Sequence, residues 1–290
     1  MGRVVDLSFL FISYARTDLL QIAIESLRSR LDHGALSGLN YEFVVSDDCS
    51  PEPWASGLRS LCVDRLVVSP KNQGMGGNTN LGVRACRGKY VVQIQDDWRF
   101  VATPLVFVKA VQVMESDKEV GLVLYVEPDD PLPFQARSLA DGTEYRVFEN
   151  DHFQGFRTGS ARPYSDRPHL KRMDFCIGIG PYKEKRPMHW VELEFSRRVA
   201  NQSRWKVAWL PSLGSPAVFE HMGAERSFNP VYRRASRLDR LESIPLLGQG
   251  FRQVRPTLKA LRDLVCPWKK STDDQHPGRE TNVRIWSLSG

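Results

Sequence analysis

Apolar runs alternate with amphipathic segments through the first 126 residues of this 290-residue chain. Continuous apolar runs are typical of strands buried on both faces, and they fall at residues 4–14, 41–46, 64–69, 90–95 and 121–126. After Thr17, the expected N-cap, apolar residues recur at helical spacing, and residues 77–86 and 105–114 predict two more helices. Strands that alternate with helices predict an α/β fold with a mostly parallel central sheet flanked by helices.

The second part of the chain has a weaker pattern. Residues 127–172 are rich in Pro, Asp, Arg and aromatic residues without periodicity, so we expect long loops there. A helix is expected at 189–201, and beyond Ser227 the chain is basic and interrupted by prolines. We therefore expect one main domain over residues 1–226, with halves at about 1–126 and 127–226, and a helical or irregular extension over 227–290.

Composition narrows the class of protein. The chain is 41% hydrophobic and 26% charged, with a net charge of +6 spread over the sequence, which argues against a nucleic-acid partner. Its five cysteines form no C-x-x-C pair, as expected for reduced thiols in a cytoplasmic protein. No window reaches the roughly 18 apolar residues of a membrane span.

The extension contains one amphipathic segment, "TLKALRDLV" at 257–265. Packing against the main domain explains its apolar face, and peripheral contact with anionic lipid on the inner face of the membrane is the alternative.

Polar residues follow three of the predicted strands, at 13–16, 46–48 and 95–97. The carboxyl ends of parallel strands meet at one edge of a sheet, and ligands bind there where the strand order reverses. These strand ends are therefore the first sign of a site. The structural alternative for a strand-end pair of acids is that one caps the next helix and the other simply faces water.

A glycine-rich segment, "NQGMGGNTNLG", follows the third strand at residues 72–82. Its glycines would let the backbone approach a ligand, and amides at the start of a helix donate to anionic oxygens. The spacing is neither G-x-G-x-x-G nor a P-loop, which excludes the usual dinucleotide and triphosphate sites. A tight turn between strand and helix explains the glycines equally well.

The pattern N-x-G-x5-N-x-G, followed by A-x-x-G-K-Y-V and "QDD", resembles the donor-binding half of family 2 glycosyltransferases with the GT-A fold. Further similar motifs fall in family order over residues 5–225: "ISYARTDLL", "VVSDDCS", "CIGIGPYKE", "WVELEFSRR" and "FEHMG". The resemblance implies a bacterial-type, inverting transferase on a single Rossmann-like domain. Its donor would be a nucleotide diphosphate sugar, with uridine the commonest base. Its acceptor would be a hydroxyl of a glycan, a lipid-linked or a small molecule.

The resemblance also implies roles for the strand-end and glycine-segment residues in donor binding. Tyr14 would stack on the base and Arg16 would contact the nucleotide. Asp48, with Asp47 as the less favoured partner, would accept a hydrogen bond from the base. The remaining donor-site residues are Asn72, Gly74 and Asn80 at the pocket floor and Asp96 at the ribose or a metal-bound water. Helix capping by Asp47, loop stabilisation by Asn80 and core packing by Tyr14 are the structural alternatives.

By the same resemblance, Asp97 binds a divalent cation, Mn²⁺ or Mg²⁺, and His221 is a further ligand. A cation offsets the negative charge that develops on a departing diphosphate. Hard cations prefer oxygen ligands, and an imidazole is compatible with Mn²⁺. A lone histidine near a strand end is also commonly structural.

Glu192 is the expected general base, which removes the proton of the acceptor hydroxyl during a direct, inverting displacement. Glu194 is the alternative, or a structural neighbour. Both acids could instead be helix-surface partners of Arg197 and Arg198.

The chain departs from the family pattern at two positions. Gln95 stands where an aspartate commonly opens the acidic triad, and Val191 stands before Glu192 where an acid is common. These departures keep a catalytically silent sugar-nucleotide or carbohydrate-binding protein as an alternative. A nucleotidyltransferase is less favoured, because no glycine-rich loop follows the first strand.

Overall fold

The computed structural model describes residues 4–31, 35–128, 132–149, 164–202, 204–223 and 284–287. Residues 1–231 and 283–290 form one compact unit, which holds every described element. Its helices are α1 (Thr17–Arg28), α2 (Trp54–Leu58), α3 (Gly74–Ala85), α4 (Leu105–Ser116), α5 (Met173–Ile179) and α6 (Met188–Ala200). Its strands are β1 (Leu7–Ser13), β2 (Tyr41–Asp47), β3 (Arg65–Val68), β4 (Tyr90–Gln95), β5 (Trp98–Phe100), β6 (Val120–Leu124), β7 (Phe134–Ser138), β8 (Glu144–Phe148), β9 (His169–Arg172), β10 (Lys206–Trp209), β11 (Phe219–His221) and β12 (Arg284–Ser287).

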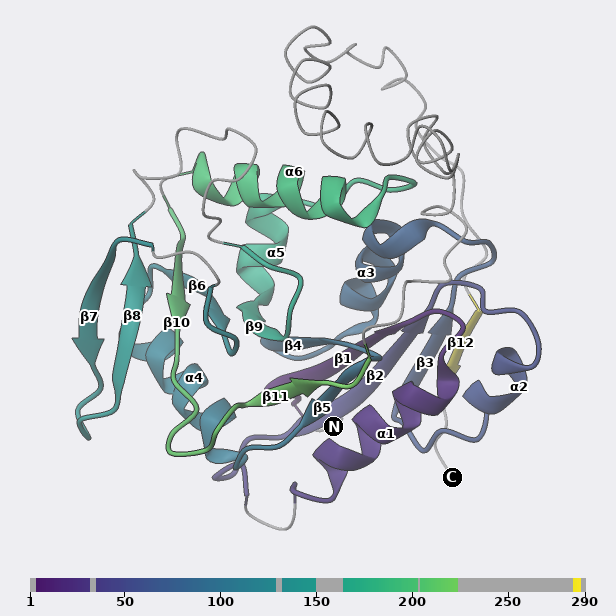
Figure 1. Ribbon diagram of the computed structural model, residues 1–290, viewed down its shortest axis with the longest axis horizontal. Helices are drawn as coiled ribbons and strands as arrows, with labels where there is room; N and C mark the ends of the chain where they lie inside the picture. The colour runs from purple at the N-terminus through teal and green to yellow at the C-terminus, as the bar shows by residue number, and fades with distance from the viewer. Residues whose placement is uncertain are drawn as a thin grey trace, which may run out of the picture. The chain divides into compact units, whose positions relative to one another are not determined.

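One large sheet forms the centre, with strand order β12-β3-β2-β1-β4-β9-β6-β10-β8-β7 (Figure 1). Strands β3, β2, β1 and β4 are parallel, while β9 runs antiparallel between β4 and β6. Strands β11 and β5 pair separately. The α/β class with a sheet that is parallel at its centre and flanked by helices is thereby confirmed.

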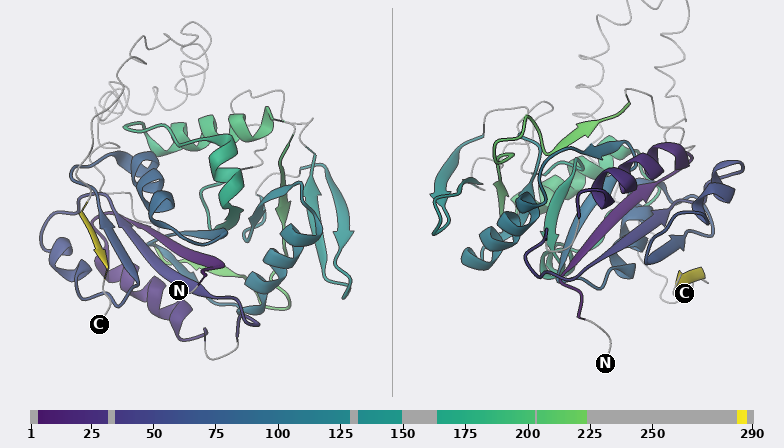
Figure 2. Two further views of the ribbon diagram at one scale, coloured as in Figure 1. Left: turned by 180° about the vertical axis from the view of Figure 1, so that it is seen from behind. Right: turned by 90° about the horizontal axis from the view of Figure 1, so that it is seen from below.

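The two faces of β1 bury different helices. Leu7, Phe9 and Phe11 belong to the core that includes α1 and α4, whereas Leu10 and Ile12 pack in the core beneath α3. This alternation is the two-residue period of a strand with both faces buried. Figures 1 and 2 show α1 on one side of the central strands and α3 with α6 on the other.

The start of α1 differs from the prediction. Arg16 occupies the N-cap position, and Thr17 is the first helical residue. The Thr17 hydroxyl donates to the Trp54 carbonyl oxygen, 2.8 Å away, so this side chain ties α1 to α2 instead of capping its own helix.

The segment expected to be loops contains three strands, β7, β8 and β9. All four residues of β9 are buried although three of them are His169, Lys171 and Arg172, so their polarity hid the strand from a hydrophobicity pattern. Strand β7 is largely exposed, as an edge strand is. In the C-terminal extension, residues 284–287 form β12, which pairs antiparallel with β3.

Several expectations lie outside the described residues, including the amphipathic segment at 257–265. The described helices are all too short or too polar to cross a bilayer. Cys49, Cys62, Cys86 and Cys176 are free thiols.

Candidate active site

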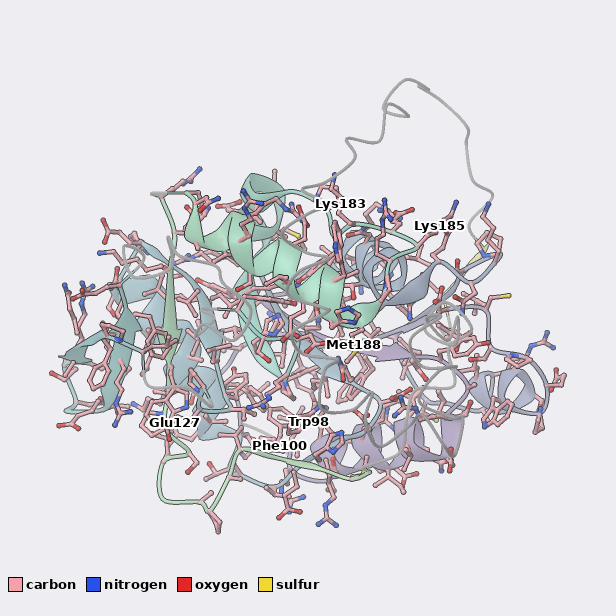
Figure 3. The ribbon with its side chains drawn as sticks, turned by 45° about the horizontal axis from the view of Figure 1, so that its top comes forward. Trp98, Phe100, Glu127, Lys183, Lys185 and Met188 are labelled. Carbon is pink, nitrogen blue, oxygen red and sulfur yellow. The ribbon has the colours of Figure 1, made fainter. Side chains whose placement is uncertain are left out.

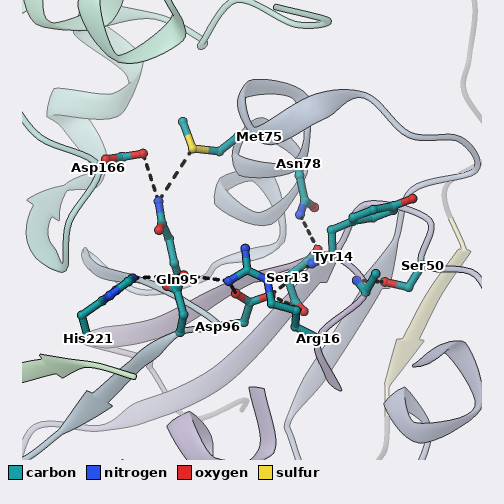
Figure 4. A network of polar contacts seen from close by, with 12 residues as sticks. Ser13, Tyr14, Arg16, Ser50, Met75, Asn78, Gln95, Asp96, Asp166 and His221 are labelled. Atoms are coloured by element: carbon teal, nitrogen blue, oxygen red, sulfur yellow. Dashed lines mark hydrogen bonds and ion pairs between the residues drawn. The ribbon is translucent and has the colours of Figure 1, made fainter. Parts of the chain in front are cut away.

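The candidate site lies where the strand order reverses, between β1 and β4. Ser13 ends β1, and Asp96 directly follows β4 on the neighbouring strand. The Ser13 hydroxyl and the Tyr14 amide both donate to Asp96 Oδ2, at 3.0 and 3.2 Å (Figure 4). The expectation that these strand ends meet is confirmed by this geometry.

Asp96 is almost fully buried, with 4% of its surface exposed. Burial raises the pKa of this carboxyl to about 7. The Arg16 charge opposes this shift, and the neighbouring Asp97 charge adds to it. The acid is therefore held in a dry site that favours a nearby positive charge.

Arg16 supplies such a charge. Its Nη1 atom lies 2.7 Å from Asp97 Oδ2 and 3.6 Å from Asp96 Oδ1. Ala15 directs it there with a φ of 54°, in the left-handed region that side-chain-bearing residues seldom adopt. The Ala15 amide donates to the Ser50 hydroxyl at 2.8 Å, which holds the turn. The Tyr14 ring points away from Asp96 in Figure 4.

His221 reaches Asp97 from the two-stranded sheet. Strand β11 pairs with β5, so His221 lies opposite Trp98, and the two ring centroids are 5.0 Å apart. The His221 Nε2 atom lies 3.3 Å from Asp97 Oδ2, and the Met222 amide donates to the Asp97 carbonyl oxygen. The structure thus brings together Asp97 and His221, which are far apart in the sequence.

These two side chains fit part of a divalent-cation site. Asp97 Oδ1 is buried and accepts no hydrogen bond from the described residues. A buried, unpartnered carboxylate oxygen beside an imidazole is a donor pair that suits Mn²⁺. No three His, Cys, Asp or Glu side chains in the described ranges converge to hold an ion. Any further ligand of an ion at this place would therefore have to be something other than a described His, Cys, Asp or Glu side chain.

The end of β2 separates the roles of two neighbouring acids. Both oxygens of Asp47 are engaged by Ser50, through its backbone amide at 2.7 Å and its hydroxyl at 2.5 Å. These bonds hold the turn after β2 and do not cap α2, whose N-cap is Pro53 with no side-chain cap hydrogen bond. Burial raises the Asp47 pKa. Asp48 is also buried, and its Oδ1 accepts the Gln73 amide at 2.7 Å. The Asn72 side chain donates to the Asp48 carbonyl oxygen, so the glycine segment and β2 hold one another.

The glycines of that segment approach another part of the protein. A Cβ atom on Gly76 would lie 2.2 Å from the Lys183 carbonyl oxygen, so a larger residue could not pack there. Gly74, with a φ of 75°, begins α3. The close approach seen at Gly76 is therefore to the segment before α6. Figure 3 labels Lys183 and Lys185 in that segment and Met188 at the start of α6.

The Asn80 side chain forms hydrogen bonds with the same segment. Its Nδ2 donates to the Tyr182 carbonyl oxygen at 2.9 Å, and its Oδ1 accepts the Tyr182 amide at 2.8 Å. The Asn80 side-chain amide therefore stabilises a loop. This arrangement fits the structural alternative to a role at the pocket floor.

Glu192 lies on α6 and contacts an acid that the sequence did not single out. A side-chain hydrogen bond joins it to Asp166, which precedes β9 and is 7% exposed. Gln95 Nε2 donates to Asp166 Oδ2 at 3.0 Å (Figure 4). Burial raises the pKa of Asp166 to about 7, and the Glu192 charge adds to the shift. Gln95 thus connects Asp166 to the end of β4, which Asp96 and Asp97 directly follow.

Glu194 is engaged elsewhere. Its Oε1 lies 3.0 Å from Arg198 Nε, one helical turn along α6. Arg198 also donates to the carbonyl oxygens of Ile179 and Pro181. Glu194 therefore forms the predicted ion pair with Arg198.

Comparisons with known proteins agree with this picture. The model of glycosyl transferase family 2 matches residues 8–171, more than half of the chain. The succinoglycan biosynthesis protein ExoO of Rhizobium meliloti (strain 1021) is 30% identical over 99 residues, which span 33% of this chain and only 27% of that protein. The mannosyltransferase PcManGT from Pyrobaculum calidifontis, solved in complex with GDP-Man and Mn²⁺, has a similar fold. Its TM-score is 0.51 at 14% identity, covering 92% of this chain and 71% of that one. The strand-end site and the family match lead to one conclusion: the chain belongs to glycosyl transferase family 2.

Proposed function

We propose that the chain transfers a sugar from a nucleotide diphosphate donor, with uridine as the first base to test, to an acceptor hydroxyl. The observation that carries this proposal is the convergence of Arg16, Asp97 and His221 at the reversal of strand order. Acids, a cationic side chain and an imidazole at this edge suit an anionic ligand that carries a metal ion.

On the donor side, Asp97 and His221 would hold Mn²⁺ or Mg²⁺. When bound, the ion would offset the charge that develops on the departing diphosphate. We assign Arg16 to the nucleotide and Asp96 to the ribose or a metal-bound water.

Around the base, we assign stacking to Tyr14 and hydrogen bonding to Asp48, with Asp47 as the weaker candidate. Asn72, Gly74 and Asn80 shape the pocket floor indirectly. The support for this is that Asn72 holds Asp48, while Asn80 holds the segment that packs on the glycines.

On the acceptor side, Glu192 would remove the hydroxyl proton as the acceptor oxygen attacks the anomeric carbon. The bond from that carbon to the diphosphate oxygen breaks in the same displacement, so the configuration inverts. Positioning of the two reactants and proton removal would together lower the barrier. Glu192 is favoured over Glu194 because Glu194 is paired with Arg198.

For the acceptor we propose a glycan, free or lipid-linked, in the assembly of a polysaccharide. The name of the Rhizobium protein supports this class, although the match spans a small part of that protein. A small-molecule hydroxyl is the other acceptor class to test. The reaction would take place in the cytoplasm, with the basic extension as the segment to test for contact with the inner face of the membrane.

The proposal is tested by donor binding followed by turnover. In a thermal-shift screen, a nucleotide sugar with Mn²⁺ should raise the melting temperature more than either alone, because ligands of the native state stabilise it. The best donor should then release nucleoside diphosphate when an acceptor is added. A panel of UDP-, GDP- and dTDP-sugars that neither binds nor turns over would contradict the proposal.

The Arg16–Asp97 ion pair favours a second candidate, a protein that binds sugar nucleotides without turnover. A guanidinium 2.7 Å from Asp97 already neutralises the acid that would hold the metal. Donor binding that is unaffected by EDTA, with no release of nucleoside diphosphate, would support this alternative.

A further inference from the structure

The two turns that follow β1 and β2 each contain a residue in the left-handed backbone region. Ala15 has a φ of 54° and Cys49 a φ of 63°. Residues with side chains seldom adopt this conformation, and it persists only where the surrounding structure holds it in place. These turns carry Arg16 and Asp48, the two residues that we assign to the nucleotide. The groups that hold the turns therefore also set where these two side chains lie.

Where the two strands end, the side chain of Asn78 on α3 joins them. This residue is 1% exposed, and its Nδ2 donates to the carbonyl oxygens of Ser13, at 3.0 Å, and Ser46, at 3.1 Å. Its Oδ1 accepts the Ser46 hydroxyl at 2.7 Å. Both donors and the acceptor of one amide are thus used on two neighbouring strands. Figure 4 shows the bond from Asn78 to the end of β1.

Ser13 extends this connection to the acids of the candidate site. Its carbonyl oxygen, which accepts from Asn78, also accepts the backbone amide of Asp48 at 3.1 Å. Its hydroxyl donates to Asp96 Oδ2 at 3.0 Å. Through Ser13, Asn78 is therefore connected to the ends of β1, β2 and β4.

Ser50 joins the same two turns at a second place. Its backbone amide and its hydroxyl both donate to the Asp47 carboxylate, and its hydroxyl oxygen accepts the Ala15 amide at 2.8 Å. The turns are thus tied twice, by Asn78 at the strand ends and by Ser50 farther along. Two ties at different points fix both the separation and the orientation of the turns, whereas a single tie would act as a hinge.

We propose that Asn78 is a positioning residue for the nucleotide: by holding the ends of β1 and β2 together, it fixes the two strained turns in the arrangement that presents Arg16 and Asp48. This inference rests on the proposed function, in which both side chains bind the nucleotide of the donor. Asn78 acts through these residues and is assigned no contact with the donor. A pocket that is already ordered binds more tightly, because the free energy of ordering does not oppose binding.

Asn78→Ala removes the side-chain bonds to both strands. With Mn²⁺ and UDP, or with GDP or dTDP where the thermal-shift screen selects it, the Kd should rise about 10-fold. The KM for the donor should rise to a similar extent, while kcat should stay within about threefold of wild type.

Thr79→Val is the matched control for this variant. Thr79 is the next residue of α3, is fully buried, and its hydroxyl has no hydrogen-bond partner among the described residues. Thr79→Val should therefore bind the same nucleoside diphosphate with the wild-type Kd. If Asn78→Ala has a lower melting temperature but also keeps the wild-type Kd, measured well below its melting temperature, Asn78 is merely structural and the inference is overturned.

A double-mutant cycle with Ser50→Ala tests whether the two ties hold one arrangement. Each single variant should weaken nucleoside diphosphate binding about 10-fold, and the double variant about 10–30-fold, because neighbouring sites that share one arrangement are not additive. A weakening of about 100-fold, the product of two independent effects, would contradict the role of Asn78 in holding the turns.

Amide hydrogen exchange tests the inference without any ligand. The amides of Tyr14, Ala15 and Asp48 all form hydrogen bonds within the tied turns. In Asn78→Ala they should exchange at least about 10-fold faster than in Thr79→Val, while the amides of β6 exchange at the same rate in both. Unchanged exchange at all three amides overturns the inference. If the amides respond but the wild-type protein binds no nucleoside diphosphate, the proposed function is contradicted and the hold of Asn78 on the turns stands.

Discussion

The buried acids on the two proposed sides of the site have different partners. Asp96 and Asp97 are bridged by Arg16, which approaches Asp97 to 2.7 Å. Asp166 has a neutral partner, the side-chain amide of Gln95, which donates to its Oδ2 at 3.0 Å. A fixed positive charge offsets the charge of buried acids, whereas a neutral amide leaves burial to raise the pKa of Asp166. The difference shows that the buried acids of this site lie in two electrostatic environments.

The largest effect should come from Glu192→Gln. The amide is nearly isosteric but cannot accept the acceptor proton, so kcat should fall roughly 10²–10⁴-fold. Donor affinity, measured by calorimetry, should be unchanged. Glu194→Gln is the matched control on the same helix and should retain activity. Equal losses in the two variants would break the distinction between the acids of α6.

Asp97→Asn should have the next largest effect, on the donor side. It weakens the oxygen ligand at the proposed cation site, so turnover should fall roughly 10²–10³-fold. The stabilisation of donor binding by Mn²⁺ should also disappear, unlike in Glu192→Gln. Calorimetric titration of the donor with Mn²⁺ or EDTA checks this. Full metal-dependent binding in Asp97→Asn would remove that residue from the cation site.

A smaller effect is expected from Asn80, which joins α3 to the segment before α6. Asn80→Ala would leave the buried amide and carbonyl groups of Tyr182 without their partner. The free energy of unfolding, measured with urea, should fall by about 1–3 kcal/mol. Gln21→Ala, on the exposed face of α1, should change it little. If Asn80→Ala has the same free energy of unfolding as wild type, the hydrogen bonds between Asn80 and Tyr182 do not contribute to stability.

A further effect concerns the pH dependence of stability. Asp166 has a folded-state pKa of about 7, raised from an ordinary 3.8. The folded chain therefore binds more protons than the unfolded chain between these values, and the free energy of unfolding should fall as the pH rises through that window. Asp166→Asn removes this contribution. Urea unfolding at pH 5 and pH 7.5 should show a smaller difference for Asp166→Asn than for wild type; equal differences would contradict the raised pKa.

The donor side could be predicted from sequence because its chemistry is local. Asp96 and Asp97 directly follow an apolar strand, and Arg16 follows another. Parallel strands then bring these ends together. His221 was predicted through the family resemblance, and its approach to Asp97 depends on the pairing of β11 with β5.

The contacts on the proposed acceptor side could not be predicted from the sequence in the same way. Asp166 lies in a stretch without periodicity, and its contact with Gln95 exists only after β9 inserts beside β4. Strand β9 itself was hidden because it buries Lys171 and Arg172, whose polar ends are satisfied by distant groups such as Gln93 and the Val120 carbonyl. Gln95 departs from the family pattern, but the sequence does not show that its partner is Asp166.

The most direct test of a single two-sided site is the acceptor-dependent release of nucleoside diphosphate by wild type, Asp97→Asn and Glu192→Gln. One donor and one acceptor are used throughout, and donor binding is measured in parallel. We predict release by wild type alone, with metal-dependent donor binding kept in Glu192→Gln and lost in Asp97→Asn. Release at the wild-type rate by either variant, or no donor binding by wild type, would contradict this account.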